Sequence, residues 1–307
     1  MKKIAVVMLC ALCGATSSYG QGRQAAPPEP PATETVAPGI PGVVAAGTKV
    51  VVLKDGLQGA EGPLMLKDGS LIFTETQANR VTKIDPQGNF STYLENTNRA
   101  NGMGLDSKGR LLATQAATVA VIAPKGSEAV LAGPYKSRPN DLVIDKKDGV
   151  YFTLTPGVFY IPSGGQAVQA GEAPSPHGII LSPDEKTLYV ADASGMYVIA
   201  FDVQADGKLT NRRNFGKYEG MNLTAADPES HADGIAIDSD GRVYVGVLTG
   251  VEVFSPQGKH LGLIPVSRRP QNLAFGGPGK KTLYLTGTGG AVFTVQMLSH
   301  GYMGRPR

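Results

Sequence analysis

Cysteine is nearly absent from this sequence. Its two cysteines, Cys10 and Cys13, both lie within the first 20 of 307 residues. Residues 1–20 have the pattern of a secretory signal peptide: a short basic start, an apolar run over residues 4–15 that is too short to span a bilayer, and small residues before the expected cleavage point. We therefore expect a periplasmic or secreted mature chain with no disulfide, no thiol chemistry and no membrane contact after cleavage.

Clusters of basic residues are also missing. The formal net charge is +3, and it falls to about +1 when Lys2 and Lys3 leave with the signal peptide. No later stretch combines a Lys/Arg-rich patch with interleaved aromatic residues, which is the usual mark of nucleic-acid binding. Nucleic acid is therefore not expected as a partner, and nothing in the sequence indicates the oligomeric state.

Helical periodicity is absent throughout, which favours an all-β chain. Residues 21–45, with AAPPEPPATETVAPG at their centre, are rich in Pro and Ala and poor in large apolar side chains. Such a composition buries too little surface to offset chain entropy, so we predict a Pro/Ala-rich linker over these residues. The folded domain is expected over residues 46–298, starting near Thr48, and residues 299–307 are expected to form a C-terminal tail.

What the sequence does contain is a repeat. A turn signal followed by a short β-type run occurs in KDGSLIFTE, SKGRLLATQ, KDGVYFTL, DEKTLYVAD, SDGRVYVGV and GKKTLYLTG. The runs have equivalent anchor residues 40, 39, 38, 55 and 40 positions apart, namely Leu71, Leu111, Val150, Leu188, Val243 and Leu283. A period near 40 with several strands per unit is typical of a β-propeller, so six copies predict an all-β, six-bladed β-propeller.

Two further features of the ring follow from this repeat. The strand-like stretch over residues 48–55 should pair into the blade that holds AVFTVQM near the C-terminus, because an unpaired edge would invite aggregation. The single long interval places an insertion of about fifteen residues between Asn211 and Ser230, and long loops without a pattern of their own are often functional.

Each copy carries a polar side chain ten or eleven residues before its anchor. These residues are Glu61, Asn101, Asn140, His177, Asp233 and Asn272. Equivalent positions in a propeller lie on one ring around the central channel. Any single Asn-Gly or Asp-Gly is an ordinary turn former, but six polar groups in register favour a shared site that holds an ion or a ligand. Carboxylate and amide oxygens suit Ca²⁺, Mg²⁺ or Mn²⁺, and one imidazole shifts the preference toward Mn²⁺ or Zn²⁺.

These residues and their flanks resemble the senescence-marker-protein, gluconolactonase and luciferin-regenerating-enzyme family of six-bladed propellers. The matching stretches, in order, are Glu61-Gly62-Pro63, Arg138-Pro139-Asn140-Asp141, SPDEKTLYVAD over residues 182–192, ADGIAID over 232–238 and NLAFGG over 272–277. Together they cover most of the chain from residue 50 to 295, and as a set they are far more specific than any one of them.

The resemblance implies a metal-dependent hydrolase that opens a sugar lactone or a similar cyclic ester, which makes it a gluconolactonase-like carboxylic-ester hydrolase. It implies that Glu61, Asn140, His177 and Asp233 surround one divalent cation, with Ca²⁺ as the first expectation and Zn²⁺, Mn²⁺ or Mg²⁺ as alternatives. Asp233 would also be the catalytic acid/base. Arg138 and Asn140 would bind the lactone substrate, with Asn101 contributing from the next blade.

The sequence departs from the family pattern at three places. His177 stands where relatives usually have Asn, Leu154 stands where an acid is frequent, and no aromatic residue occurs near Leu64. Two other hypotheses stay open: a non-catalytic propeller that binds a sugar or protein at a degenerate site, and a different hydrolase or a strictosidine-synthase-like enzyme on the same fold, whose activity would not depend on a metal. We interpret His177 as a metal or substrate contact and His231 as a loop histidine.

Overall fold

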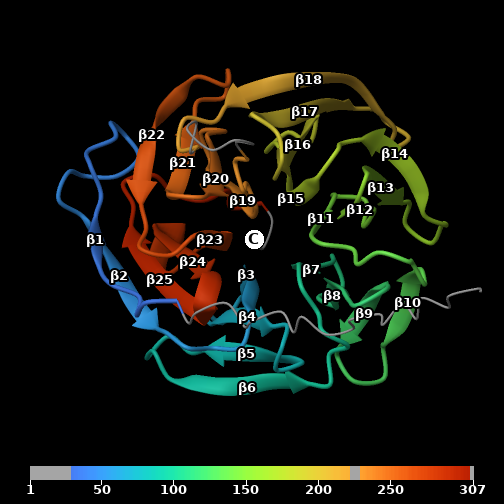
Figure 1. Cartoon of the computed structure of the whole chain (residues 1–307). Coiled ribbons are helices and arrows are strands. Elements are labelled where there is room, and N and C mark those ends of the chain that lie inside the picture. The colour runs from blue at the N-terminus through green and yellow to red at the C-terminus, as the bar shows by residue number, and fades with distance from the viewer. Residues whose placement is uncertain (1–28, 222–228, 305–307) are drawn as a thin grey trace, which may run out of the picture.

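The structure is a computed structural model that describes residues 29–221 and 229–304. The described residues form six antiparallel sheets arranged around a central axis and contain no α-helix (Figure 1). The predicted all-β, six-bladed β-propeller is therefore confirmed. The predicted signal peptide and residues 21–28 lie outside the described residues. No described segment forms a helix of the length and hydropathy that crossing a bilayer requires.

Five blades are four-stranded, and in each the chain runs from the inner strand outward. Blade 1 holds β3 (Ala60–Met65), β4 (Leu71–Glu75), β5 (Arg80–Ile84) and β6 (Phe90–Glu95); blade 2 holds β7 (Met103–Leu105), β8 (Leu111–Thr114), β9 (Val119–Ala123) and β10 (Ala129–Ala132). Blade 3 holds β11 (Leu142–Ile144), β12 (Val150–Leu154), β13 (Gly157–Ile161) and β14 (Val168–Glu172); blade 4 holds β15 (Pro176–Leu181), β16 (Thr187–Asp192), β17 (Tyr197–Val203) and β18 (Leu209–Lys217). Blade 5 holds β19 (Ile235–Ile237), β20 (Val243–Val247), β21 (Gly250–Phe254) and β22 (His260–Pro265).

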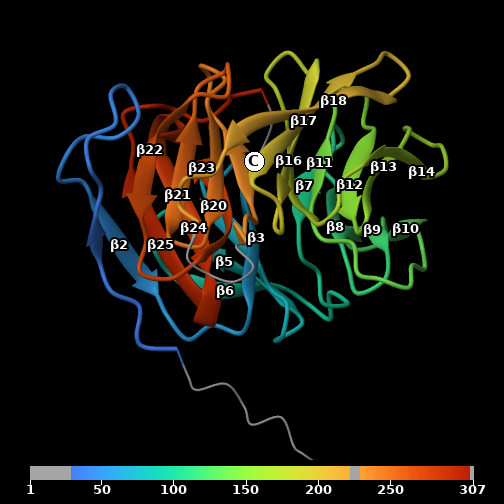
Figure 2. The same ribbon diagram turned by 45° about the horizontal axis from the view of Figure 1, so that its top comes forward.

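Blade 6 joins the two ends of the chain. From the inside outward it contains β23 (Pro270–Gly276), β24 (Thr282–Gly287), β25 (Ala291–Gln296), β2 (Lys49–Lys54) and β1 (Thr35–Val36). The predicted closure is confirmed, because β2 pairs antiparallel with β25, with Val50 opposite Val295 and Val52 opposite Phe293 (Figure 2). Two short 3₁₀ turns, at Pro278–Lys280 and Thr288–Gly290, connect the strands of this blade.

The repeat anchors mark the second strand of every blade. Four of them open β4, β8, β12 and β20, and the other two are the second residues of β16 and β24. Alternating apolar side chains from neighbouring sheets meet between the blades and form the core; Ile179 and Val190 of blade 4, for example, share one buried cluster with Ile235 and Val245 of blade 5. The core therefore lies between sheets and leaves the ends of the inner strands free to carry a site.

Residues 29–45 differ from the linker prediction. Thr35 and Val36 pair with β2, and the side chains of Ile40, Val43 and Val44 are buried in the core of blades 5 and 6. Composition averaged over the segment missed these few apolar side chains, which suffice because β2 offers an open sheet edge at this place. The folded domain thus begins before residue 46.

The C-terminal residues also pack against the domain. Gly301 forms a β-bridge with Asp238, and Ser299 Oγ lies 2.9 Å from the buried hydroxyl of Tyr244. Residues 299–304 are therefore part of the propeller surface, which differs from the predicted tail. Residues 305–307 lie outside the described residues.

The predicted insertion follows β18. This strand is nine residues long and continues to Lys217, so the extra length lies between Lys217 and the start of β19 at Ile235. Residues 222–228 of this stretch are outside the described residues.

Candidate active site

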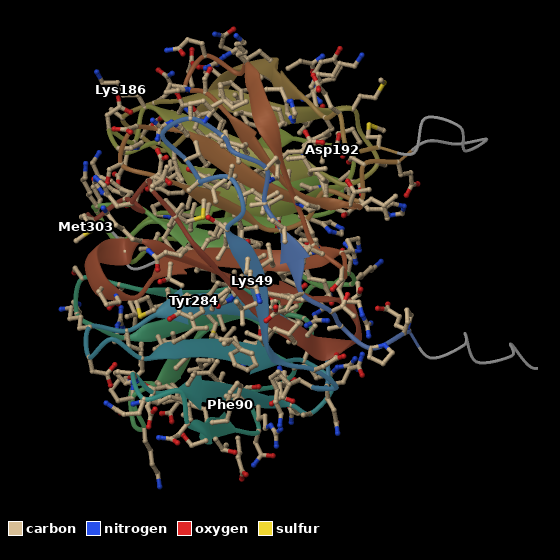
Figure 3. The ribbon with its side chains drawn as sticks, turned by 90° about the vertical axis from the view of Figure 1, so that its left-hand side faces the viewer. Lys49, Phe90, Lys186, Asp192, Tyr284 and Met303 are labelled. Atoms are coloured by element: carbon tan, nitrogen blue, oxygen red, sulfur yellow. The ribbon has the colours of Figure 1, made fainter. Side chains whose placement is uncertain are left out.

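The six polar residues of the predicted ring lie at the same end of the inner strands. Glu61, His177 and Asn272 are within the first residues of β3, β15 and β23, and Asn101, Asn140 and Asp233 come just before β7, β11 and β19. Pro176, beside His177, pairs with Asp192 at the end of β16. Figure 3 shows Asp192 toward one face of the propeller and Lys186, before β16, toward the other. The ring therefore belongs to the face that carries Asp192.

Close approach between blades explains the glycines that follow ring residues. A Cβ atom on Gly102 would collide with the side chain of Asp141 in the next blade, and one on Gly234 would collide with Asn272. A side chain at either position would push the neighbouring ring residue away. These glycines are thus required by packing at the ring, in addition to any role in a turn.

Buried threonines hold the backbone of the ring. Thr114 Oγ1 donates to the carbonyl oxygen of Asn140 at 2.6 Å, and Thr153 Oγ1 donates to that of His177 at 2.6 Å. Both threonines lie on the second strand of one blade and bind the ring residue of the next. Each follows its repeat anchor by three residues, and Thr74 of blade 1 makes the same contact with Asn101, whereas blades 4 and 5 have Ala191 and Gly246 at this position.

Asp233 lies between two basic side chains. Its Oδ1 lies 3.2 Å from His177 Nδ1, and its Oδ2 accepts a hydrogen bond from Arg269 Nη1 at 3.1 Å. Asp233 is only 4% exposed, whereas the His177 side chain is 32% exposed. An imidazole and a guanidinium therefore flank a buried carboxylate, and the imidazole is the more accessible to a ligand.

Glu61 and Asp141 add two more buried carboxylates. Gln271 Nε2 donates to Glu61 Oε1 at 3.2 Å, and the Gly62 N–H donates to Glu61 Oε2 at 3.2 Å. Asp141 is fully buried, and Asn272 Nδ2, from the blade on the opposite side of the ring, lies 3.5 Å from its Oδ2. Asp141 and Asn272 thus meet across the channel.

Titration of the site reflects this concentration of negative charge. Burial, together with the charges of Asp233 and Asp141, raises the pKa of Glu61 well above its usual range. Burial works to lower the pKa of His177, but the close contact with Asp233 and the negative charges of Asp233 and Glu61 outweigh it, so that the pKa of His177 is raised. Both shifts show a site that favours added positive charge.

The predicted substrate-binding residues lie nearby. Arg138 Nη2 donates to the carbonyl oxygen of Arg99 at 2.9 Å. Burial lowers the pKa of the Arg138 guanidinium, and the charge of Glu61 opposes that shift, which places Arg138 within electrostatic range of Glu61. Asn140 is half-buried, and Asn101 is buried with an Oδ1 atom that has no hydrogen-bond partner among the described residues.

His231 does not join this cluster. It lies outside any strand, has a positive φ of 49°, and its Nδ1 is 3.8 Å from Glu229 Oε2. Only its backbone carbonyl faces the site, where Arg269 Nη1 lies 3.4 Å away. The interpretation of His231 as a loop histidine agrees with this position.

The donor set suits a divalent cation in its chemistry. Within residues 29–221 and 229–304, no three His, Cys, Asp or Glu side chains converge closely enough to enclose a metal ion as they stand. Asn101 has an unpartnered Oδ1, and burial together with the charges of Asp233 and Asp141 raises the pKa of Glu61; a cation would relieve both conditions. Oxygen ligands from Glu61, Asp233 and amides, with one imidazole, fit a hard or borderline dication.

Three residues of the site were missed by sequence reasoning: Asp141, Arg269 and Gln271. Asp141 directly follows the ring position of Asn140, and the repeat itself marks only one position per blade. Arg269 and Gln271 lie in the stretch RRPQN, just before the ring residue Asn272. The sequence signal for these two residues is a basic side chain and an amide side chain immediately before a ring position.

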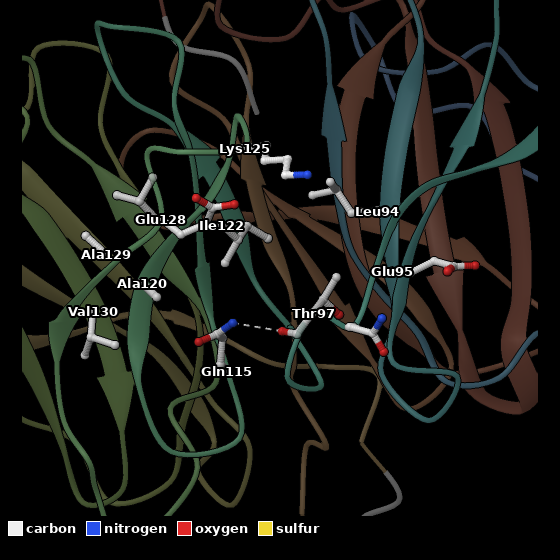
Figure 4. A pocket seen from close by; sticks show the side chains of 12 residues that line it. Leu94, Glu95, Thr97, Gln115, Ala120, Ile122, Lys125, Glu128, Ala129 and Val130 are labelled. Atoms are coloured by element: carbon white, nitrogen blue, oxygen red, sulfur yellow. Dashed lines mark hydrogen bonds between the residues drawn. The ribbon is translucent and has the colours of Figure 1, made fainter.

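A peripheral hollow lies elsewhere and shares no residue with the ring. Its volume is about 510 Å³, and it is formed by the outer strands β6, β9 and β10 of blades 1 and 2 (Figure 4). At its base Gln115 Nε2 donates to the carbonyl oxygen of Thr97 at 2.9 Å, and Lys125 and Glu128 lie along its wall. The hollow has no convergent set of acids comparable to the ring among the residues that line it.

Comparison with known proteins agrees with the ring and its blades. The profile of the SMP-30/Gluconolactonase/LRE-like region matches residues 59–289, which include every ring residue. The chain belongs to this family. Its members named below are similar to it in sequence or in fold.

Two curated relatives are lactonases by name. A gluconolactonase of Zymomonas mobilis is 28% identical over 298 aligned positions, which cover 81% of this chain and 82% of the relative. A 6-deoxy-6-sulfogluconolactonase of Pseudomonas putida is 24% identical and covers 78% of this chain and 86% of its own. Among solved structures, a gluconolactonase from Xanthomonas campestris superimposes with a TM-score of 0.74 at 23% identity, over 88% of this chain and 99% of that one. That structural likeness supports the fold.

Proposed function

We propose that this protein is a metal-dependent hydrolase that opens a sugar lactone or a similar cyclic ester, as a gluconolactonase does. The observation that carries the proposal is the buried Asp233 carboxylate. His177 lies 3.2 Å from it, and Glu61 is near enough for the charge of Asp233 to raise its pKa. Family membership and the lactonase names of two relatives support the same reaction class.

Glu61, His177 and Asp233 would hold the cation, with Asn140 as a further oxygen ligand. Ca²⁺ is the first choice because oxygen ligands dominate, and the imidazole of His177 admits Mn²⁺ or Zn²⁺, with Mg²⁺ as a further alternative. When bound, such a cation supplies Lewis-acid polarisation of the lactone carbonyl and lowers the pKa of a water molecule.

The chain's own residues then orient the substrate and move the proton. Arg138 and Asn140, with Asn101 beside them, would bind the lactone oxygens. Asp233 would take a proton from water on one of its carboxylate oxygens as the water oxygen bonds to the lactone carbonyl carbon. The ring C–O bond then breaks, the departing ring oxygen takes that proton, and the product is the open hydroxy acid. Arg269 and His177 would keep the Asp233 carboxylate in one orientation.

We further propose that this reaction takes place in the periplasm or outside the cell, on a small-molecule lactone. The pattern of residues 1–20 supports export, and the ring at one face of the propeller is suited to a small ligand rather than to a nucleic acid.

Lactone hydrolysis by the purified mature protein tests the proposal. With glucono-δ-lactone and a pH indicator, the wild-type protein should show hydrolysis well above the spontaneous rate. Asp233→Asn should lose most of this activity. Asp206→Asn is its matched control and should keep the wild-type rate, because Asp206 is exposed and pairs only with Lys208 among the described residues. If the wild-type protein binds the lactone without accelerating its hydrolysis, the non-catalytic binding propeller is the correct function.

A further inference from the structure

One short segment supplies a hydrogen-bond donor to each of the three buried acids of the ring. Arg269 donates to Asp233 at 3.1 Å, Gln271 to Glu61 at 3.2 Å, and Asn272, with the longest contact, to Asp141 at 3.5 Å. We call these three side chains, Arg269, Gln271 and Asn272, the donor segment.

The position of β23 makes this triple contact possible. Its neighbours in the ring are β19 on one side and β3 on the other, and blade 3 lies opposite (Figure 1). Arg269 therefore extends toward blade 5, Gln271 toward blade 1, and Asn272 across the channel. One stretch of chain therefore contacts all three acids.

The backbone of the donor segment is firmly held. The Gly234 N–H donates to the carbonyl oxygen of Gln271 at 2.7 Å, and the preceding Arg268, only 6% exposed, is paired with Glu29 and lies 3.6 Å from Asp55. These contacts do not involve the side chains of Arg269 or Gln271. Substitutions at those two positions can therefore remove a donor without releasing the loop that carries it.

Electrostatics makes the donor segment a competitor of a metal ion. Arg269 Nη1 donates to Asp233 Oδ2, while His177 is next to Oδ1 of the same carboxylate. Gln271 Nε2 donates to Oε1 of Glu61. A dication bound to the same carboxylates would meet the positive charge of Arg269 at short range, where like charges repel. Without a dication, the same guanidinium offsets the cost of burying Asp233.

We propose that the donor segment is an internal substitute for the metal ion: it stabilises the three ring carboxylates in the metal-free protein and thereby weakens the affinity of the site for divalent cations. The proposal rests on the proposed function in one respect, since it takes the ring to be the metal site. It adds that residues of blade 6, which do not bind the metal, set how tightly it is held.

Arg269→Met separates this role from simple packing, because it keeps an apolar side chain of similar length but removes the charge and the donors. Ca²⁺ and Mn²⁺ are titrated separately into chelator-treated protein by calorimetry, and thermal unfolding is recorded without cation and at saturation. We expect the variant to unfold at a lower temperature without cation, to bind the cation about tenfold or more tightly, and to recover most of the lost stability at saturation.

Two further variants complete the experiment. Gln271→Met should show the same opposite changes to a smaller degree, because it removes a neutral donor, and it keeps the test valid if Arg269→Met fails to fold. Arg213→Gln is the matched control: Arg213 pairs with Asp202 on the outer strands of blade 4 at 2.6 Å, and the affinity for cations should not change.

The opposite results overturn the proposal. Unchanged or weaker cation binding in both Arg269→Met and Gln271→Met would show that the donor segment does not compete with a metal. If Arg269→Met loses the same thermal stability with and without saturating cation, Arg269 only forms a structural ion pair with Asp233. If neither the wild-type protein nor the variants bind a cation, the proposed metal site fails and the competition fails with it, while lactone hydrolysis measured in chelator remains a separate test of the catalytic function.

Discussion

Acidic side chains lie at both ends of the inner strands, and their surroundings differ between the two ends. Glu61 is the second residue of β3, and Asp68 comes three residues after the end of this strand. Asp68 accepts the Ser70 N–H at 2.9 Å, and this hydrogen bond, with help from Lys83, lowers the pKa of Asp68. Burial and neighbouring acids raise the pKa of Glu61. The acid at one end of β3 thus has hydrogen bonds that stabilise its charge, whereas the acid at the other end lies where its charge is disfavoured.

The same contrast recurs in blade 3. Asp145, after β11, accepts the N–H groups of Lys147 and Gly149 at 2.8 Å each, whereas Asp141, before β11, faces Asn272 across the channel. The turn acids find their partners two to four residues along the chain, as turn residues do. Glu61 and Asp141 each accept the N–H of the next residue as well, but their other oxygens meet side chains from other blades, so a bound cation would find its acidic ligands at the ring.

The largest expected effect comes from removing the central acid of the ring. Asp233→Asn keeps the size of the side chain but removes the base, and general acid–base catalysis typically contributes roughly 10²–10⁴-fold. We expect kcat for lactone hydrolysis to fall by about that factor, measured by steady-state kinetics. Full activity in Asp233→Asn would remove Asp233 from the mechanism.

Two buried glutamates of blade 1 should respond to pH in opposite directions. Glu75, opposite Ala60 on the strand beside Glu61, is buried. Burial works to raise its pKa, but hydrogen bonds from Thr82, the Gln58 N–H and Arg80 outweigh it and lower the pKa of Glu75. The folded state therefore favours the proton on Glu61 and disfavours it on Glu75.

Thermal unfolding of metal-free Glu61→Gln and Glu75→Gln across a pH series measures this difference. As the pH rises from 4.5, the ordinary pKa of both groups, toward the raised pKa of Glu61, the wild-type protein should lose stability relative to Glu61→Gln. Relative to Glu75→Gln, the wild-type protein should be more stable above pH 4.5 and lose that advantage as the pH falls through the lowered pKa of Glu75. Parallel curves for the two variants would contradict the contrast.

A turn acid should affect stability and spare the chemistry. Asp145→Ala removes the acceptor of two backbone N–H groups and of the Tyr160 hydroxyl, which lies 2.8 Å away. We expect a loss of about 1–3 kcal/mol in the free energy of unfolding, measured in denaturant. The kcat of the folded fraction should equal that of the wild-type protein; a fall as large as in Asp233→Asn would erase the distinction between the two ends.

The smallest expected effect concerns a threonine that positions the ring. Thr153→Val leaves the carbonyl oxygen of His177 without its donor at 2.6 Å. We expect a loss of about 1 kcal/mol in stability and a several-fold change in kcat/KM that follows from the displaced imidazole. Thr92→Val, on the exposed outer strand β6, is the matched control and should change neither quantity.

The fold could be predicted from sequence because its signals are local and repeated. Each blade has its own turn residues and its own β-type run, and the anchors Leu71 to Leu283 recur at a near-constant period, so the ring positions followed by counting. Ring closure was also predictable, because residues 48–55 read as a strand with no partner nearby.

The remainder depends on contacts that no local pattern carries. Ile40 and Val43 are buried only because β2 of blade 6 presents an edge to them. Arg269 and Gln271 meet acids that are 36 and 210 residues away in the chain, and their role becomes visible only when β23 is seated between β19 and β3. Asp141 lies one residue after a ring position, and the repeat pattern alone does not distinguish it from its neighbours.

Chelation tests the central claim most directly. Lactone hydrolysis by the purified wild-type protein should be lost after treatment with EDTA and should return when Ca²⁺ or Mn²⁺ is added in excess of the chelator. Hydrolysis that persists at the full rate after the bound metal has been removed, as verified by elemental analysis, would contradict a metal site in the ring and favour a metal-independent enzyme on the same propeller.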